Sequence, residues 1–223
     1  KNVLLLDSGD IFQGTPYFNT FLGHLEMKLM SQMGYDASTM GNHDFDIGLE
    51  GFLKAKQHAD FPFLCANYNF SNTILAEETQ PYKIFRKGGI KVGVFGIGIE
   101  LKGLVSKNNY GDTEFEDPIL KANKTAKLLK NKGCDLIICL SHLGYSYDSA
   151  DKVSDLVLAR KSEHIHMILG GHTHTFLEKP VIEKNINKDF VLINQVGWAG
   201  LKLGRIDIDI SSHIERKSNI SIV

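Results

Sequence analysis

The segment GNHDFD, from Gly41 to Asp46, places an amide, an imidazole and two carboxylates directly behind the short apolar stretch DASTM. So much polar chemistry at the end of a predicted buried strand indicates either a turn or a functional site. Three further apolar runs end in the same way, in the sequences VLLLDSGD, LIICLSH and HMILGGHTH. The candidate residues that these four segments contribute are Asp10, Asn42, His142, His172 and His174.

The elements that must position these residues alternate along the chain between apolar strand-like runs and amphipathic helical runs. Helices are predicted at 21–33, 49–59, 118–131 and 148–160, the first from the helical spacing of Leu22, Leu25, Leu29 and Met33. Strands are predicted at 3–7, 36–40, 61–67, 135–141, 165–171, 179–184, 189–195 and 202–210, and residues 82–99 are predicted to form two strands joined by a hairpin turn at Lys87–Gly89. We therefore expect one α/β domain over residues 1–223, without an internal repeat.

The five candidate residues are expected to lie at one rim of the fold, because open α/β sheets gather their ligand sites at the carboxyl ends of the strands. Their carboxylate, amide oxygen and imidazole donors, with no thiolate among them, suit Zn, Mn, Fe or Co better than Ca or a structural zinc site. Gly9, Gly41 and Gly171 each immediately precede a predicted ligand, where a turn without a Cβ lets the next side chain point inward. The sequence therefore predicts a catalytic metal.

Each candidate also has a simpler interpretation. The DSGD segment around Asp10 often forms only a turn, and Asn42 suits a left-handed residue or the N-cap of the helix predicted from Leu49. A lone histidine after a core strand, such as His142, is typical of a hydrogen-bonded structural residue. The pair in GGHTH favours a site more strongly, because histidines at i and i+2 of an extended turn point the same way. Four other histidines lack such contexts and are expected to be surface or core residues: His24, His58, His164 and His166.

The composition is that of an ordinary globular protein, with 43% hydrophobic and 23% charged residues among 223. A formal net charge of −1 gives no support for binding a nucleic-acid polymer or an anionic membrane. No apolar run approaches the roughly 18 residues that a membrane-spanning helix requires. Three cysteines in apolar contexts favour buried free thiols over a disulfide framework: Cys65, Cys134 and Cys139. Because the chain opens without Met inside a predicted strand, we expect the numbering to begin within a longer product.

The ordered segments GD, GNHD, SH and GHTH resemble the signature of the calcineurin-like metallophosphoesterases. Within that superfamily, LLLDSGDIFQGTPYF, GNHDFDIG, CANY and GGHTH resemble the catalytic domain of the 5′-nucleotidase family, which includes 2′,3′-cyclic nucleotide phosphodiesterases. The resemblance covers nearly the whole chain. It implies a four-layer α/β fold, in which two β-sheets packed face to face are flanked by helices, with two divalent metal ions at the strand ends.

The resemblance also implies a role for each predicted metal ligand. Asp10 resembles the carboxylate that bridges both metals. Asn42, His142 and His172 resemble the remaining protein ligands of the second metal, and His174 resembles a ligand of the first. A neutral amide at Asn42 would leave the metal pair more positive charge for a phosphate than another carboxylate would.

The catalytic roles fall on the remaining polar residues of GNHDFD. His43 is similar to the family's catalytic histidine, which lies near the substrate phosphate without binding metal, and Asp46 matches the carboxylate that orients it. A protonated His43 beside an anionic substrate would stabilise developing charge or protonate the leaving alkoxide. Two metals about 3.5–4 Å apart would activate a bridging water for in-line attack.

Two features depart from the family pattern. The first family motif, an Asp-x-His pair on a strand before VLLLD, is absent, so two ligands of the first metal are missing and truncation is the expected reason. The C-terminal nucleotide-binding domain of such nucleotidases is also absent from this chain, so a separate or downstream domain is an expected partner. Trp198 offers a stacking surface, although a lone tryptophan after a strand is more often part of a core.

These observations predict a dinuclear metal-dependent hydrolase of small phosphoesters, preferably nucleoside 5′-phosphates. The alternatives are a 2′,3′-cyclic nucleotide phosphodiesterase, a sugar-phosphate hydrolase, or a non-catalytic, metal-poor binding module. The resemblance implies a periplasmic, secreted or surface-anchored protein, with a cytoplasmic one as the alternative.

Overall fold

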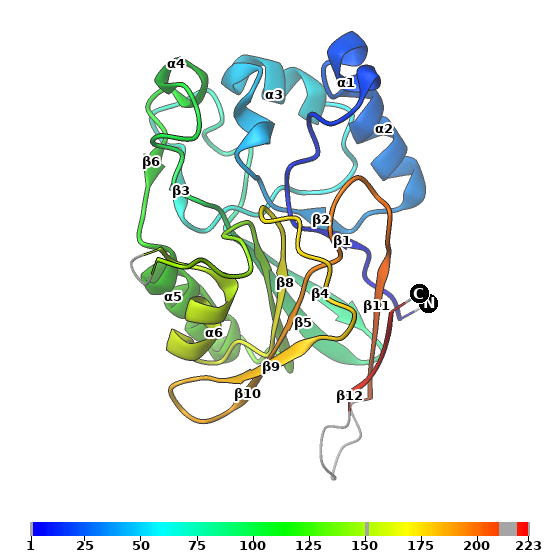
Figure 1. The fold of residues 1–223 in the computed structure, drawn as a ribbon, viewed down its shortest axis with the longest axis vertical. Coiled ribbons are helices and arrows are strands. Elements are labelled where there is room, and N and C mark those ends of the chain that lie inside the picture. The colour runs from blue at the N-terminus through cyan, green and yellow to red at the C-terminus, as the bar shows by residue number, and fades with distance from the viewer. Residues whose placement is uncertain (1, 150–151, 210–217, 223) are drawn as a thin grey trace.

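A six-stranded mixed sheet forms the centre of the computed structural model, which describes residues 2–149, 152–209 and 218–222 (Figure 1). In the order β4-β5-β7-β8-β10-β9, its strands are Tyr82–Lys87, Ile90–Ile97, Leu136–Ser141, Met167–Gly170, Phe190–Asn194 and Val181–Lys184. The inner strands are parallel to one another, and both edge strands run antiparallel to their neighbours. The predicted hairpin at Lys87–Gly89 is confirmed, because Gly88 and Gly89 join β4 to β5 with φ values of 59° and 83°.

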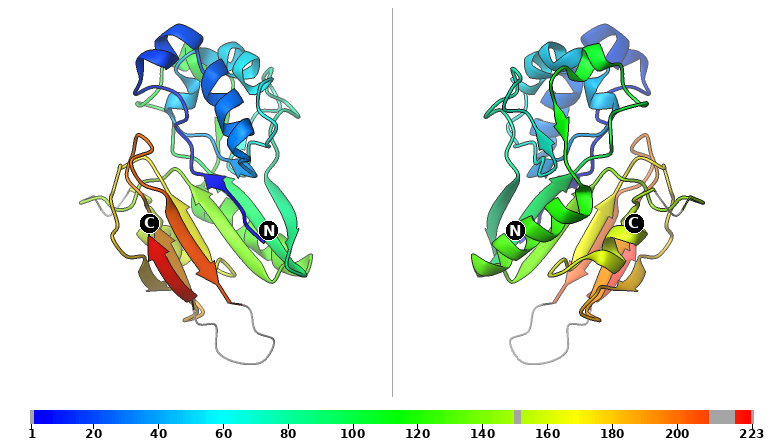
Figure 2. Two further views of the ribbon diagram at one scale, coloured as in Figure 1. Left: turned by 90° about the vertical axis from the view of Figure 1, so that its right-hand side faces the viewer. Right: turned by 90° about the vertical axis from the view of Figure 1, so that its left-hand side faces the viewer.

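Two helices cover one face of this sheet: α5 (Pro118–Asn131) and α6 (Asp155–Lys161) (Figure 2). The start of α5 follows from local sequence, because the side chain of Asp117 accepts a hydrogen bond from the N–H of Leu120 and a proline opens the first turn. The buried cluster that joins helices and sheet includes Ala122, Ala126 and Leu129 of α5, Leu158 of α6, and Ile137, Cys139 and Ile168 of the strands.

Shorter strands cover the opposite face. β1 (Leu6–Asp7) pairs in parallel with β2 (Ala37–Ser38), and β11 (Gly204–Ile208) pairs antiparallel with β12 (Ser218–Ile222). Residues of β1, β2 and β11 share a buried cluster with the sheet, among them Leu6, Ala37, Ile206, Val94 and Ile138. The α/β class is therefore confirmed, and in the described residues the second β layer consists of two separate two-stranded sheets.

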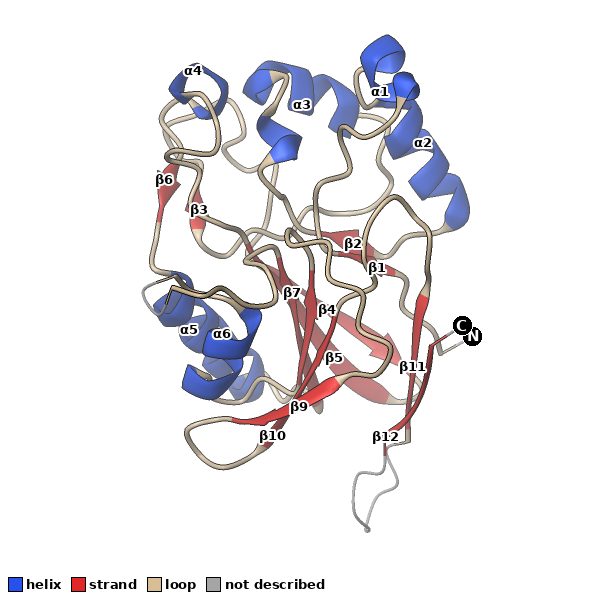
Figure 3. Ribbon diagram, viewed as in Figure 1, coloured by secondary structure: helices blue, strands red, loops and turns tan. Residues whose placement is uncertain are grey.

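The remaining elements gather at one end of the strands (Figure 3). They are α1 (Pro16–Phe21), α2 (His24–Met33), the 3-10 helix η1 (His43–Phe45), α3 (Gly48–Lys56), α4 (Lys107–Tyr110), β3 (Tyr68–Asn69) and β6 (Glu114–Phe115). Their core is rich in phenylalanine, with Phe12, Phe45, Phe52 and Phe63 almost fully buried. This helical end carries GNHDFD, so its packing fixes one wall of the candidate site.

The helix predicted at 21–33 is wrong in its boundaries and in its buried face. The predicted segment is divided between α1 and α2 at Gly23, which has a left-handed φ of 83°. A Cβ at this position would lie 2.1 Å from the ring of Phe12, so no other residue fits there. The buried residues of α2 are Met27 and Met30, whereas Leu29 and Met33 are exposed. The apolar spacing therefore indicated a helix but not the side that packs.

Other boundaries also differ from the predictions. Residues 61–67 form only isolated bridges, from Phe63 to Ser38 and from Leu64 to Gln80. The helix predicted at 148–160 begins only at Asp155, because the Ser154 side chain caps it, and residues 150 and 151 lie outside the described residues. The strand predicted at 202–210 is observed at Gly204–Ile208, while residue 210 is also outside the described residues.

All three cysteines are free and buried, as predicted, so the disulfide alternative is wrong. Within the described parts of the chain, none of the helices combines the length and apolar character needed to cross a bilayer.

Candidate metal centre and active site

Side chains from four strand ends meet at one rim of the fold. β1 leads to Asp10, β2 to Asn42, β7 to His142 and β8 to His172. One donor atom each from Asp10, His142 and His172 lies within 4.8 Å of the other two. The Asn42 side-chain oxygen lies 2.8 Å from Nδ1 of His172, so the amide belongs to the same cluster.

His142 has one nitrogen bound by the fold and one left for the cluster. Its Nδ1 lies 2.7 Å from the backbone carbonyl of Ser8, and donation to that carbonyl leaves Nε2 as the nitrogen that binds a metal when the ring is neutral. Nε2 is 2.9 Å from Oδ2 of Asp10 but lies off the hydrogen-bonding direction, so this buried nitrogen has no hydrogen-bond partner among the described residues. A second nitrogen fixed by a carbonyl is typical of a metal-binding histidine, and the donor set fits a divalent ion.

Asp10 and His142 shift each other's pKa. Burial would raise the pKa of Asp10, but the charge of His142 and its hydrogen bonds outweigh burial and lower it. Burial would lower the pKa of His142, and the negative charge of Asp10 raises it instead. Burial, followed by the charge of His142, lowers the pKa of His172 to about 4, so His172 is a neutral imidazole able to bind a metal at neutral pH.

Three of the predicted ligands have strained backbones. Asp10, His172 and His174 have φ values of 62°, 71° and 53°, in the left-handed region that non-glycine residues rarely adopt. Such conformations cost about 1–3 kcal/mol each and persist where the surrounding structure imposes them, often at functional sites. The fold therefore holds the loops of these three residues in strained conformations that fix the positions of their side chains.

The preceding glycines are needed for close contact between loops. A Cβ on Gly9, whose φ is 86°, would lie 2.5 Å from the backbone nitrogen of Gly41. A Cβ on Gly41 would lie 2.2 Å from Oδ1 of Asp10. At Gly171 the nearest atoms would be 3.1 Å away, so the requirement there is weaker.

The local-turn interpretations of Asp10 and Asn42 do not hold. Oδ1 of Asp10 accepts a hydrogen bond of 2.8 Å from the backbone N–H of His43, which is 33 residues away. Asn42 has φ −69° and ψ −34°, so it is not left-handed, and the N-cap of α3 is Ile47. Both side chains therefore serve long-range contacts.

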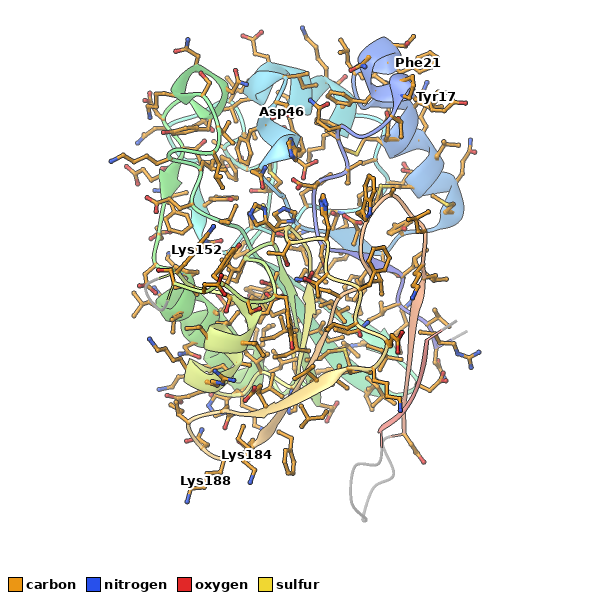
Figure 4. All side chains as sticks on the ribbon, viewed as in Figure 1. Tyr17, Phe21, Asp46, Lys152, Lys184 and Lys188 are labelled. Atoms are coloured by element: carbon orange, nitrogen blue, oxygen red, sulfur yellow. The ribbon has the colours of Figure 1, made fainter. Side chains whose placement is uncertain are left out.

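His43 and Asp46 lie beside the cluster at its solvent edge. Nδ1 of His43 is 2.8 Å from Oδ2 of Asp46, and 46% of the His43 side chain is exposed. Gln13 also donates a 2.7 Å hydrogen bond to Asp46, whose position at the helical end is seen in Figure 4. His43 is thus oriented, solvent-accessible and outside the group of close metal donors.

His174 is not among the mutually close donors of Asp10, His142 and His172 in the part of the chain that the structure describes. Its ring stacks on Trp198, with 5.7 Å between ring centroids and 12° between planes. Because 52% of Trp198 is exposed, the interpretation of this tryptophan as a core residue is wrong.

Comparison with known proteins decides the family. Residues 1–176 match the calcineurin-like phosphoesterase family. The chain belongs to this family. The matched range contains Asp10, Asn42, His142, His172 and His174.

Relatives within the family are named as nucleotidases. The chain is 40% identical to the snake venom 5′-nucleotidase of Crotalus adamanteus over 79% of its own length and 29% of the relative's length. It is 35% identical to the NAD 5′-nucleotidase of Haemophilus influenzae, with 89% and 34% covered. The structure of a 5′-nucleotidase precursor from Thermus thermophilus superimposes with a TM-score of 0.86 at 30% identity, covering 100% of this chain and 46% of that one. The chain therefore spans less than half of each of these relatives.

Asp44 has a structural role that the sequence did not indicate. Asp44 of GNHD is fully buried, and its carboxylate accepts hydrogen bonds from the backbone N–H groups of Asp10 (2.9 Å), Ile11 (3.0 Å) and Gly41 (2.8 Å). It therefore ties the Asp10 loop to the Asn42 loop. Burial, followed by the charge of Asp10, raises the pKa of Asp44 to about 7.

The four histidines predicted to be ordinary lie outside the metal cluster of the described residues. His24 and His58 contact each other on the helical end, and Nδ1 of His166 accepts a hydrogen bond from the N–H of Ile137. His164 lies 3.9 Å from the carboxylate of Glu163.

Proposed function

We propose that this chain is a catalytic domain that hydrolyses phosphoesters, with nucleoside 5′-phosphates as its main substrates and two divalent ions as cofactors. The observation that carries the proposal is the group of donor atoms from Asp10, His142 and His172, one from each residue, which all lie within 4.8 Å of one another at the rim of the fold.

Asp10, Asn42, His142 and His172 would hold one ion, and Asp10 with His174 would contribute to holding the other. When bound, the ions would polarise the phosphoryl oxygens and lower the pKa of water for attack on phosphorus. Nitrogen and oxygen donors of this kind fit Zn, Mn, Fe or Co. The number and identity of the ions belong to the proposal.

His43 would hold the proton that the leaving group needs. With Asp46 accepting from Nδ1–H, the proton to be transferred is carried on Nε2, the other ring nitrogen. The backbone N–H of His43 separately holds the Asp10 carboxylate, so this residue links proton transfer to the position of a proposed metal ligand.

Nucleotides are favoured as substrates because relatives are named 5′-nucleotidase and NAD 5′-nucleotidase. A relative from Bacillus subtilis, 32% identical over 99% of this chain, is named a trifunctional nucleotide phosphoesterase, which supports phosphoesters of nucleotides as the substrate class. Because the chain covers 17–46% of these proteins, we also propose that a separate or downstream nucleotide-binding domain acts with it. The venom relatives support action outside the cytoplasm.

The test is a phosphate-release panel with Mn²⁺ or Zn²⁺ on AMP, 2′,3′-cyclic AMP and ribose 5-phosphate. We expect AMP to be hydrolysed fastest and all activity to require added metal. Faster release from ribose 5-phosphate would favour a sugar-phosphate hydrolase. Metal binding without hydrolysis of any ester would favour the non-catalytic module.

A further inference from the structure

A buried carboxylate outside the proposed metal set lies directly behind it. Asp155, at the start of α6, has no exposed surface. Its Oδ1 accepts a 2.5 Å hydrogen bond from the hydroxyl of Ser141, and its Oδ2 accepts a 2.9 Å hydrogen bond from the amide of Gln195. A buried carboxylate is costly for a fold and is kept only where its hydrogen bonds are satisfied.

Gln195 follows β10 and is 1% exposed. Besides Asp155, its Nε2 donates a 2.8 Å hydrogen bond to the carbonyl of Gly171, and its Oε1 accepts from the N–H of Thr175 at 3.2 Å and from the hydroxyl of Thr173 at 3.3 Å. Two acceptors around the amide nitrogen and a backbone donor at the oxygen fix the amide orientation. The Gln195 side chain thus forms hydrogen bonds with both ends of the loop 171–175.

Ser141 connects the Asp155 carboxylate to the loop that begins with His142. It immediately precedes His142, and its carbonyl accepts a 2.9 Å hydrogen bond from the N–H of Gly171. A Cβ on Gly170 would lie 2.0 Å from Oδ2 of Asp155, so the carboxylate fits directly against the end of β8. Asp155 therefore contacts the ends of β7 and β8, and it reaches loop 171–175 through Gln195.

We propose that Asp155 and Gln195 are positioning residues, which together hold the loops of His142, His172 and His174 in the geometry that binds metal. The inference rests on the metal site proposed above. Its physical reason is that His172 and His174 have left-handed backbones, which an unrestrained loop would leave. The hydrogen bonds of Gln195 to both sides of these residues prevent that relaxation, and Asp155 keeps Gln195 oriented.

The main test compares Asp155→Ala and Gln195→Ala with wild type by calorimetric titration of Mn²⁺ into the full chain. We expect Mn²⁺ to bind roughly 10–100-fold more weakly in each variant, the range found for residues that orient metal ligands. The effect of the double variant should be smaller than the product of the single effects, because both act through one network. Asp155→Asn should restore affinity, since its amide can accept from Gln195 and donate to Ser141.

Asn185 supplies a matched control. It is 5% exposed, and its side-chain oxygen accepts hydrogen bonds from the N–H groups of Asn187 and Asp189, both at 2.9 Å. It lies in the turn between β9 and β10, between Lys184 and Lys188 at the end of the molecule opposite Asp46 (Figure 4). Asn185→Ala should lower stability without weakening Mn²⁺ binding.

A second readout needs no metal. Amide hydrogen exchange over residues 171–175 should be faster in Asp155→Ala and Gln195→Ala, but not in Asn185→Ala. If Asp155→Ala does not fold, Gln195→Ala carries both measurements. Unchanged exchange and unchanged Mn²⁺ affinity in Gln195→Ala would overturn the inference, as would an equal loss of affinity in Asn185→Ala. A wild-type chain that binds no metal would instead overturn the metal site, whereas the exchange data would still decide whether these residues hold the loop.

Discussion

Replacing His43 by Ala separates proton transfer from metal binding. The variant keeps the backbone N–H that holds Oδ1 of Asp10, and it removes a side chain that is 46% exposed. Neither the fold nor the position of the Asp10 carboxylate should therefore change. What is lost is the Nε2 proton of a ring that Asp46 orients through Nδ1. Loss of a general acid typically lowers turnover about 10²–10⁴-fold, which corresponds to about 3–5 kcal/mol in the barrier.

The assay measures turnover on AMP and on p-nitrophenyl phosphate together with metal content. Because p-nitrophenolate leaves without protonation, the loss should be much smaller on the activated ester than on AMP. His58→Ala, which removes a half-buried histidine of the helical end, serves as the control and should leave both rates unchanged. If His43→Ala loses metal and keeps its activity per bound metal, His43 is a ligand and the assignment as an acid is wrong.

Three further predictions concern the ligands, the buried acid and the tryptophan. Single Ala changes at Asn42, His142 and His172 should each lower metal occupancy and activity together, and wild-type activity in His142→Ala would leave only a structural role for that residue. Burial raises the pKa of Asp155 from 3.8 to about 7, so the native state keeps a proton that the unfolded chain releases between these values. The stabilisation from this proton is present below about pH 4 and is lost as the pH rises through 7. The free energy of unfolding, relative to that of Asp155→Asn, should therefore fall by roughly 4 kcal/mol between pH 4 and pH 8. Denaturant titrations at each pH can measure this change, and a difference that stays constant with pH would contradict the prediction. The fluorescence of Trp198, the sole tryptophan, should be quenched when Co²⁺ binds, because its ring stacks on His174; Co²⁺ binding without quenching would remove His174 from the metal site.

Local signals in the sequence were sufficient for the elements with strong caps or turns. Asp117 with Pro118 determines the start of α5, and Gly88 with Gly89 determines the β4–β5 hairpin. The division of the helix at Gly23 was not predictable, because its cause is the ring of Phe12, which a periodicity argument does not include. Tertiary contact overrides local propensity at such positions.

The candidate site was predictable to the extent that its residues follow strands. Asp10, His142 and His172 come together because the carboxyl ends of their strands share one rim. The supporting residues were missed for a different reason. Asp44 bonds backbone groups up to 34 residues away, and Gln195 bonds Asp155 across 40 residues, so neither has a local pattern in the sequence.

Crystals of this chain soaked in Zn²⁺ or Mn²⁺ would test the metal site most directly, through the anomalous scattering of the ion. We predict a peak about 2.0–2.2 Å from Nε2 of His142, and coordinated by a carboxylate oxygen of Asp10 and the side chains of Asn42 and His172. No peak among these donors at saturating metal, or a peak only elsewhere on the surface, would contradict the account.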